Sequence, residues 1–223
     1  MRLSISVLAV MSLALNATLA HQASAGIVTI DDFQTPLSQS TGEGILGQRI
    51  VDTANSIVLS PRSWNQSVTI SGGVASTQMS VDATVGEAFL ETSLRYDNFG
   101  TIDLRNVTMR IVGQLTQASQ GIAAYATCFI DIRDSFSRGL SIDIGGNAAS
   151  QTEWNLDFAN EPRWIDLSMI TEMRIYARTY AGFGSTASLS LSLTSFQLVG
   201  IPAPAAAPLL ALAGLTARGR RRK

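Results

Sequence analysis

The sequence predicts an all-β protein whose body, residues 26–200, folds as one antiparallel β-sandwich. Apolar and polar residues alternate with period two in several short runs, and Gly-rich turns separate these runs. The body shows no convincing amphipathic helix, and its length suits a single domain. Each strand is therefore expected to bury one face and to expose the other.

Five runs show the alternation most clearly, and in each the apolar residues share one phase while Ser, Thr or charged residues share the other. The runs are 67–71, 107–111, 140–144, 152–158 and 189–193. After Leu193 the apolar phase shifts by one position, to Phe196 and Leu198, which predicts a bulge or a bend in the last strand. Turns are predicted at 71–73, 97–100, 145–147 and 182–184.

The order of motifs along the body resembles that of galactose-binding-like jelly rolls in secreted bacterial proteins. It runs from Ile30-Asp31-Asp32-Phe33 at the first strand to the segments 164–168 and 170–175 before the last strand. The resemblance implies the jelly-roll form of the sandwich and implies no particular binding site.

Charge is distributed unevenly along the chain, although the formal net charge is only −1. Five of the sixteen positive charges lie in the last six residues, and Arg2 supplies another at the start. The segment between the ends carries ten arginines against seventeen acids, a formal charge of −7. An acidic body of this kind argues against nucleic acid as a partner.

Few residues of nucleophilic or metal-binding type are present. Cys128 is the only cysteine, so the chain can form neither an intrachain disulfide nor a thiolate zinc cluster. The only histidine is His21, and its removal with a leader would exclude His-based triads and metal sites. The only lysine is Lys223, in the tail. Catalysis would therefore depend on carboxylates and tyrosines.

Residues 1–25 have the pattern of a secretory signal peptide. Arg2 precedes an apolar run from Leu3 to Leu15, and the small residues Ala23 and Ala25 fit a signal-peptidase cleavage site. The apolar run is shorter than the roughly 20 residues that a membrane span needs. A secreted protein beginning at Gly26 is expected.

Residues 201–223 have the three parts of a sorting tail: a Pro-x-Pro motif, a short hydrophobic helix and a basic cluster. The motif is Pro202-Ala203-Pro204, and the apolar stretch runs from 205 to 217. The basic cluster consists of Arg218, Arg220, Arg221, Arg222 and Lys223. Positive charges after an apolar segment hold a tail across the bilayer with its end in the cytoplasm, and this segment is short enough to suit a transient hold before cutting.

This tail resembles the PEP-CTERM sorting signal of Gram-negative bacteria, in the variant whose motif is Pro-Ala-Pro. The resemblance covers about the last 22 residues and implies an exosortase-type processing enzyme as a partner, besides signal peptidase. It also implies export to the outer envelope or to an extracellular polysaccharide matrix, with the tail in transient contact with the membrane.

Trp64 is the best candidate for stacking on a sugar ring. Its neighbours in 61–66 are mostly polar and show no clear period, whereas Trp154 falls on the apolar face of its run and is expected in the core. Partial core packing is the alternative for Trp64.

Two adjacent carboxylates, Asp31 and Asp32, are candidate Ca²⁺ ligands, because calcium takes oxygen ligands and sandwich folds hold it at strand ends. Neighbouring strand residues point to opposite faces, however, so a turn-capping or solvated role is the alternative. No other cofactor is expected.

The preferred hypothesis is a non-enzymatic, exported protein that is associated with extracellular polysaccharide or the envelope and has either a structural or a glycan-binding role. The alternative is a carbohydrate-active enzyme that uses a pair of carboxylates, for which Glu87, Glu91 and Glu153 are available. Cys128 shares a phase with Ala126 and Ile130 and is expected to be a buried, unreactive residue.

Overall fold

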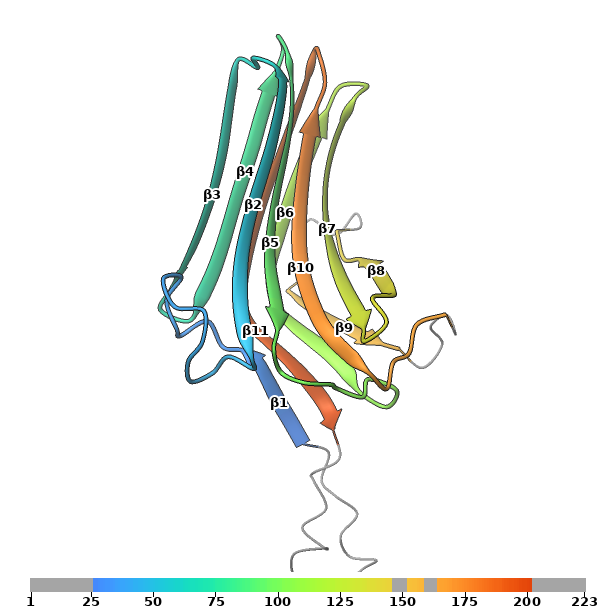
Figure 1. Ribbon diagram of the computed structural model, residues 1–223. Helices are drawn as coiled ribbons and strands as arrows, with labels where there is room; N and C mark the ends of the chain where they lie inside the picture. The colour runs from blue at the N-terminus through green and yellow to red at the C-terminus, as the bar shows by residue number, and fades with distance from the viewer. Residues whose placement is uncertain (1–25, 146–151, 159–163, 202–223) are drawn as a thin grey trace, which may run out of the picture. The chain divides into compact units, whose positions relative to one another are not determined.

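A computed structural model describes residues 26–145, 152–158 and 164–201, and this part of the chain is built from strands (Figure 1). Residues Ile27–Val199 form one compact unit. The strands are β1 (Gly26–Asp31), β2 (Gln48–Leu59), β3 (Ser63–Ser71), β4 (Val74–Ala83), β5 (Glu87–Asp97), β6 (Thr108–Gln120), β7 (Ala124–Asp134), β8 (Gly139–Asp143), β9 (Glu153–Asp157), β10 (Ile170–Ala181) and β11 (Ser185–Ile201).

The strands form two antiparallel sheets that pack face to face. The six-stranded sheet has the order β3-β4-β11-β6-β9, with β1 also paired to β11, and the five-stranded sheet has the order β2-β5-β10-β7-β8. From β4 to β7, and again from β9 to β11, successive strands alternate between the two sheets. The chain thus winds around the core, and the expected antiparallel sandwich of jelly-roll type is confirmed.

The predicted alternation of apolar and polar residues matches the strands that form. The five expected runs fall on β3, β6, β8, β9 and β11. The predicted phase shift in the last strand is also confirmed, because the pairing of β11 with β6 slips between Leu193 and Ser195. Phe196 and Leu198 are fully buried beyond this bulge. The extra residue thus keeps the apolar side chains of a 17-residue strand directed into one core.

A buried ion pair joins the two sheets near the start of the body. Asp31, at the end of β1, and Arg49, on β2, are both almost completely buried, and their side chains lie 2.8 Å apart. The Tyr96 hydroxyl of β5 donates to the same Asp31 carboxylate at 3.1 Å, and the backbone N–H of Phe33 donates to it at 2.7 Å. Arg49 also donates to the Thr35 carbonyl oxygen at 2.7 Å, so both charges have several partners.

A second carboxylate, Asp134, holds the turn between β7 and β8 against the segment that leads into β10. It accepts hydrogen bonds from the backbone N–H groups of Phe136, Arg138 and Asp166 and from the Arg138 side chain. Burial by itself raises the pKa of Asp134, but these hydrogen bonds lower it to about 2. Asp134 is therefore ionised at any physiological pH.

The predicted signal peptide with Ala23 and Ala25, and the tail with Pro202, Ala203, Pro204 and its basic cluster, lie outside the described residues. Within the described ranges, no helix is long and apolar enough to cross a membrane.

Replacement of Asp31 by Asn should lower the free energy of unfolding by about 3–5 kcal/mol, because it leaves the Arg49 charge buried without its partner. Urea denaturation at neutral pH measures this loss. Asp103→Asn is the matched control, because Asp103 forms an exposed ion pair with Arg105 and should have little effect. Equal, small effects of the two substitutions would contradict the importance of the buried pair.

Candidate functional site

The outer face of the five-stranded sheet carries a group of aromatic side chains from adjacent strands. In its central strand, β10, one phase is buried and includes Ile175, Ala177 and Thr179. The other phase points away from the six-stranded sheet, and its residues are Glu172, Arg174, Tyr176, Arg178 and Tyr180. Strand β10 therefore presents aromatic and charged side chains in alternation.

The neighbouring strands place further aromatic rings beside those of β10. Tyr180 pairs with Phe89 of β5 on one side and with Tyr125 of β7 on the other. Four residues earlier in β10, Tyr176 pairs with Phe129 of β7. Residues directly opposite each other in adjacent strands share a face, so these five side chains form one group. We call Phe89, Tyr125, Phe129, Tyr176 and Tyr180 the aromatic cluster.

Four of the five rings in the aromatic cluster form two stacked pairs. Tyr125 and Tyr180 have centroids 5.5 Å apart with an interplanar angle of 27°, and Phe129 and Tyr176 have centroids 5.2 Å apart with an angle of 28°. Tyr125 is 44% exposed, whereas Tyr176 is only 8% exposed because its neighbours cover it. The first pair is therefore open to solvent, whereas Tyr176 of the second pair is largely covered.

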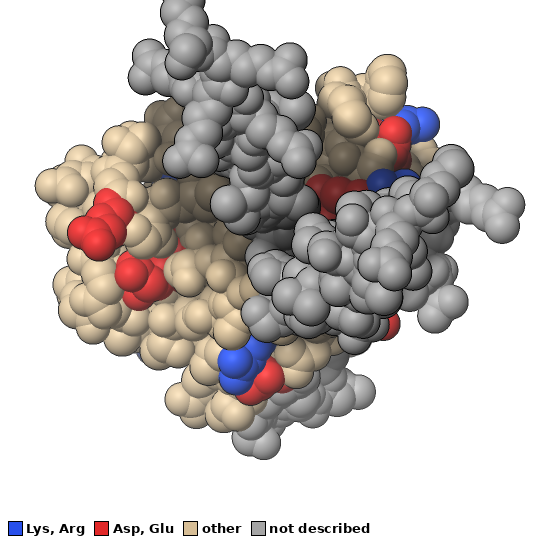
Figure 2. All heavy atoms as spheres, turned by 90° about the horizontal axis from the view of Figure 1, so that it is seen from below, with Lys and Arg blue, Asp and Glu red and all other residues tan. Residues whose placement is uncertain are grey.

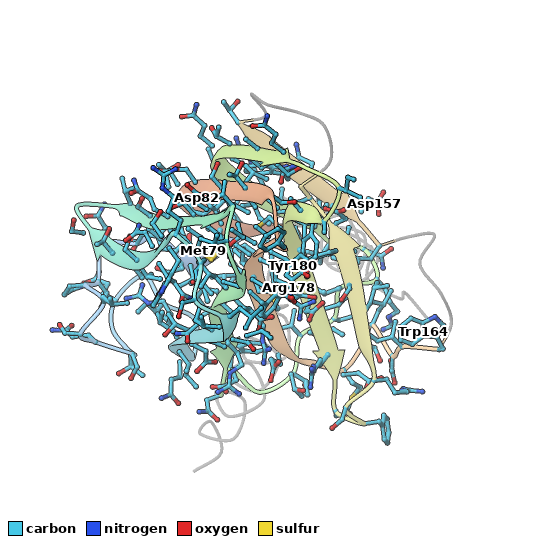
Figure 3. All side chains as sticks on the ribbon, turned by 90° about the horizontal axis from the view of Figure 1, so that it is seen from above. Met79, Asp82, Asp157, Trp164, Arg178 and Tyr180 are labelled. Carbon is cyan, nitrogen blue, oxygen red and sulfur yellow. The ribbon has the colours of Figure 1, made fainter. Side chains whose placement is uncertain are left out.

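Arg178 lies between the two pairs and is held on both sides. Its Nε donates to the Glu91 carboxylate at 2.5 Å, and its guanidinium lies 4.6 Å from the centroid of the Tyr176 ring. Burial would lower the pKa of Arg178, but the hydrogen bond and the charge of Glu91 raise it. Figure 3 shows Arg178 and Tyr180 next to each other, well away from Trp164.

Tyr180 is anchored through its hydroxyl, which donates to Glu87 at 2.9 Å. This hydrogen bond raises the pKa of Tyr180 above the ordinary tyrosine value, with a smaller contribution from burial. The contact with Glu87 thus fixes the orientation of the Tyr180 ring. A ligand that packed on this ring would therefore lose less binding free energy to the ordering of the side chain.

The rest of this face, toward the start of β10, is a network of charges. Glu172 lies within 4 Å of three arginines: Arg95 and Arg133 at 3.7 Å and Arg174 at 3.4 Å. Arg95 also approaches Asp97 at 3.6 Å. The outer face is therefore divided into an aromatic half near the end of β10 and a charged half near its beginning.

Trp64, the sequence-based candidate for stacking, is not part of this group. It lies on β3, at the edge of the six-stranded sheet, and pairs with the buried Val81 of β4. Its 46% exposure confirms that it is more accessible than Trp154, which is 3% exposed in the core. A role for Trp64 in sugar binding stays a prediction, separate from the aromatic cluster.

Asp31 and Asp32 do not form a shared ligand set. Arg49, Tyr96 and Phe33 already engage the Asp31 carboxylate, and the guanidinium takes the place beside it where a cation would lie. Asp32 instead accepts a hydrogen bond from the backbone N–H of Gln34 at 3.0 Å, the turn-capping role considered as the alternative. Among the described residues, no group of three His, Cys, Asp or Glu could hold a metal ion. The calcium expectation thus gains no support.

The three candidate catalytic carboxylates do not form a glycosidase pair either. Glu153 is on β9 of the six-stranded sheet, where Arg110 and Asn155 hydrogen-bond to it and lower its pKa. Glu87 and Glu91 share a strand face but lie four residues apart, about 13 Å along β5. Glycosidase carboxyl groups are separated by about 5–10 Å. Each of these two side chains is also held by its own partner, Tyr180 or Arg178.

The outer face of the six-stranded sheet has a different composition. A hollow of about 530 Å³ lies over β3, β4, β6 and β11, lined by small polar residues such as Ser63, Ser80, Ser119 and Ser188, with Asp82 as its charged member. No aromatic residue lines it. At the lower end of the molecule, which Figure 2 shows from below, most visible Arg side chains of the described residues lie next to Asp or Glu, and neither sign of charge forms a large patch. The aromatic cluster is therefore a better candidate for a binding site than this hollow of small polar residues.

The aromatic cluster was not among the sites predicted from the sequence, although the sequence contains a signal for it. Residues 172–180 alternate Glu-x-Arg-x-Tyr-x-Arg-x-Tyr against small and apolar residues, so one strand face is both aromatic and charged. In β7, Tyr125 and Phe129 share a phase in the same way. The pairing of these two strands, which brings the rings together, could not be read from either segment alone.

Comparison with known proteins identifies a similar fold only at a distance. No family model matches the chain, and no curated protein matches it. The family 11 carbohydrate-binding module of the cellulase Lic26A-Cel5E of Clostridium thermocellum is similar in structure, with a TM-score of 0.41 and 13% identity over 82% of this chain and 99% of that chain. The family 30 carbohydrate-binding module of Cel9D-Cel44B of the same organism has a TM-score of 0.41 and 12% identity over 79% and 98%. The agarase AgWH50C has a TM-score of 0.36 and 16% identity over 80% of this chain and 25% of that chain. At these values the likenesses carry no argument about function, which depends on the site itself.

Cys128 lies in β7 directly behind this face, in the buried phase, as the sequence predicts. Burial raises the pKa of its thiol to about 12, with a smaller contribution from the charge of Asp143. The thiolate that reacts with electrophiles is therefore scarce at neutral pH.

We expect Cys128 of the native protein to react with a thiol-specific reagent such as dithionitrobenzoate far more slowly than a free thiol at pH 8. The same protein in concentrated urea should react at the rate of an exposed thiol, which provides the internal control. Rapid labelling of the native protein would contradict the burial of Cys128.

Proposed function

We propose that this protein is a non-enzymatic, exported glycan-binding protein that holds a polysaccharide on the outer face of its five-stranded sheet. The aromatic cluster, flanked by Glu87, Glu91 and Arg178, is the observation that carries this proposal. Aromatic rings that are fixed in place and partly exposed are costly to leave in water, and they mark recognition surfaces.

The two kinds of side chain on this face match the two kinds of surface on a sugar. The faces of a pyranose ring carry C–H groups that pack on aromatic rings, and the open Tyr125–Tyr180 pair offers such a surface. The rim of the sugar carries hydroxyl groups that both donate and accept hydrogen bonds. Carboxylate oxygens of Glu87 and Glu91, and N–H groups of Arg178, lie beside the rings to serve them.

A binding role fits these side chains better than a hydrolytic one. Glu87 and Glu91 are engaged by Tyr180 and Arg178 and lie too far apart along β5 for the paired-carboxylate mechanism. Their positions on a rigid sheet instead suit side chains that orient a ligand without transforming it.

Export and sorting complete the proposal. The predicted signal peptide, residues 1–25, would direct the chain across the inner membrane. The Pro202-Ala203-Pro204 motif and the basic cluster at 218–223 would present the tail to an exosortase-type enzyme. A polysaccharide-binding body delivered in this way would act in the outer envelope or the extracellular matrix.

We expect Tyr125→Ala and Tyr180→Ala each to weaken binding to a soluble polysaccharide by about tenfold or more, because central aromatic contacts contribute roughly 2 kcal/mol or more to binding. Affinity electrophoresis and calorimetry with soluble glucan, galactan and xylan measure the effect.

Trp164→Ala is the matched control, because Trp164 is 51% exposed but lies away from this face (Figure 3). Trp64→Ala tests the other expected contact. Loss of binding in the Trp64 variant with full binding in both tyrosine variants would move the site to β3. Absence of binding to every polysaccharide would contradict the proposed function.

Mass spectrometry of the protein from its native host tests the sorting proposal. The expected mature chain begins at Gly26 and lacks the basic cluster that ends at Lys223. An intact C-terminus in the exported protein would contradict processing of the tail.

A further inference from the structure

We propose that the glycan held on this face carries no acidic groups, because every outward arginine of the five-stranded sheet already lies against a carboxylate. This inference rests on the proposed function, because it specifies the class of ligand for the same site.

Each arginine on the outer face of the five-stranded sheet already has an acidic partner. Arg178 contacts Glu91 at 2.5 Å, in the centre of the aromatic half. In the charged half, Arg133 and Arg174 both approach Glu172, and Arg95 approaches Glu172 as well as Asp52 and Asp97. Each of these four guanidinium groups thus lies within 4 Å of a carboxylate, and a uronate or sulfate would have to compete with that carboxylate for the positive charge.

Acidic residues also outnumber the arginines on this face. The outward positions of the five strands hold four arginines and seven acids, an excess of three negative charges. The acids are Asp52, Glu87, Glu91, Asp97, Asp131, Asp143 and Glu172. A polyanion that approached this face would meet like charge, and the surrounding acidic body would add to the repulsion.

An uncharged sugar neither competes with the carboxylates for the arginines nor is repelled by the excess of acids. Its hydroxyl groups can accept from Arg178 and donate to Glu91 while the ion pair between them stays intact, since each group has further hydrogen-bonding capacity. The open face of the Tyr125–Tyr180 pair requires only C–H surface from the ligand. A uronate that accepted from the remaining N–H groups of Arg178 would place a second negative charge beside the Glu91 carboxylate, and the two carboxylates would repel each other.

The test compares three polymers with the full chain at low and high salt: an uncharged β-glucan, polygalacturonate and chitosan. The expected result is binding to the glucan with an affinity that changes less than about twofold between 20 and 500 mM salt, because no ion pair with the ligand is screened. Polygalacturonate should bind at least about tenfold more weakly, a difference of roughly 1.4 kcal/mol.

The sharper test is a gain of function. Glu91→Gln releases the Arg178 charge but keeps its place over the Tyr176 ring, and we expect this variant to bind polygalacturonate several-fold more tightly than the wild type, in a salt-sensitive manner. Glu153→Gln is the matched control, because it releases Arg110 on the other sheet and should not improve binding.

The outcomes separate the two proposals. Binding of none of the three polymers would contradict glycan binding as a whole. Preferential binding of polygalacturonate by the wild type would leave glycan binding intact and overturn the inference about charge, whereas salt-sensitive binding of chitosan would agree with the excess of acids on this face. An unchanged response of a folded Glu91→Gln variant would also overturn it. Should that variant fail to fold, the salt dependence of the wild type still decides.

Discussion

The buried pair of Asp31 and Arg49 is the constraint on which the rest of the structure depends. The pair connects β1 of the six-stranded sheet to β2 of the five-stranded sheet. It also connects β1 to β5, because Tyr96 of β5 donates to the same Asp31 carboxylate. Arg49 and Tyr96 are also directly paired in the ladder between β2 and β5. A slip of the β2–β5 ladder would separate these buried polar side chains from Asp31, so the ion pair adds to the apolar pattern in specifying the register.

This register decides what the outer face presents. With Tyr96 directed into the core, the alternate positions of β5 put Phe89 and Glu91 on the outside. A slip by one residue would bury these two side chains and expose Leu90 and Leu94 instead. The edge contact between the Tyr96 and Phe196 rings, with centroids 5.4 Å apart, ties the same choice to the last strand of the opposite sheet. The buried ion pair and the aromatic cluster thus lie on opposite faces of the same sheet and depend on the same register.

The candidate site was only partly predictable, and particular residues show why. Trp64 was the obvious candidate for stacking because it is a large ring among polar neighbours, and it does prove half-exposed. The more extensive ring surface consists of tyrosines and phenylalanines that lie on three strands spread over ninety residues of sequence. Asp31 similarly reads as a strand-end carboxylate, and nothing within its own segment indicates that Arg49 will lie against it.

The sequence by itself determined the class of fold, the strands with a clear period-two pattern and the bulge near Leu193, because all of these depend on residues close together in the chain. It also determined that residues 26–200 contain no histidine and a single cysteine, which excludes His-based triads and an intrachain disulfide in the body, since composition needs no structure. Only the tertiary structure decided which strands are neighbours, and therefore that Tyr180 lies between Phe89 and Tyr125 and that Arg178 is matched by Glu91. The reason is physical: alternation specifies the face of each side chain within a strand, but the partners across a sheet are set by long-range packing of the whole sandwich.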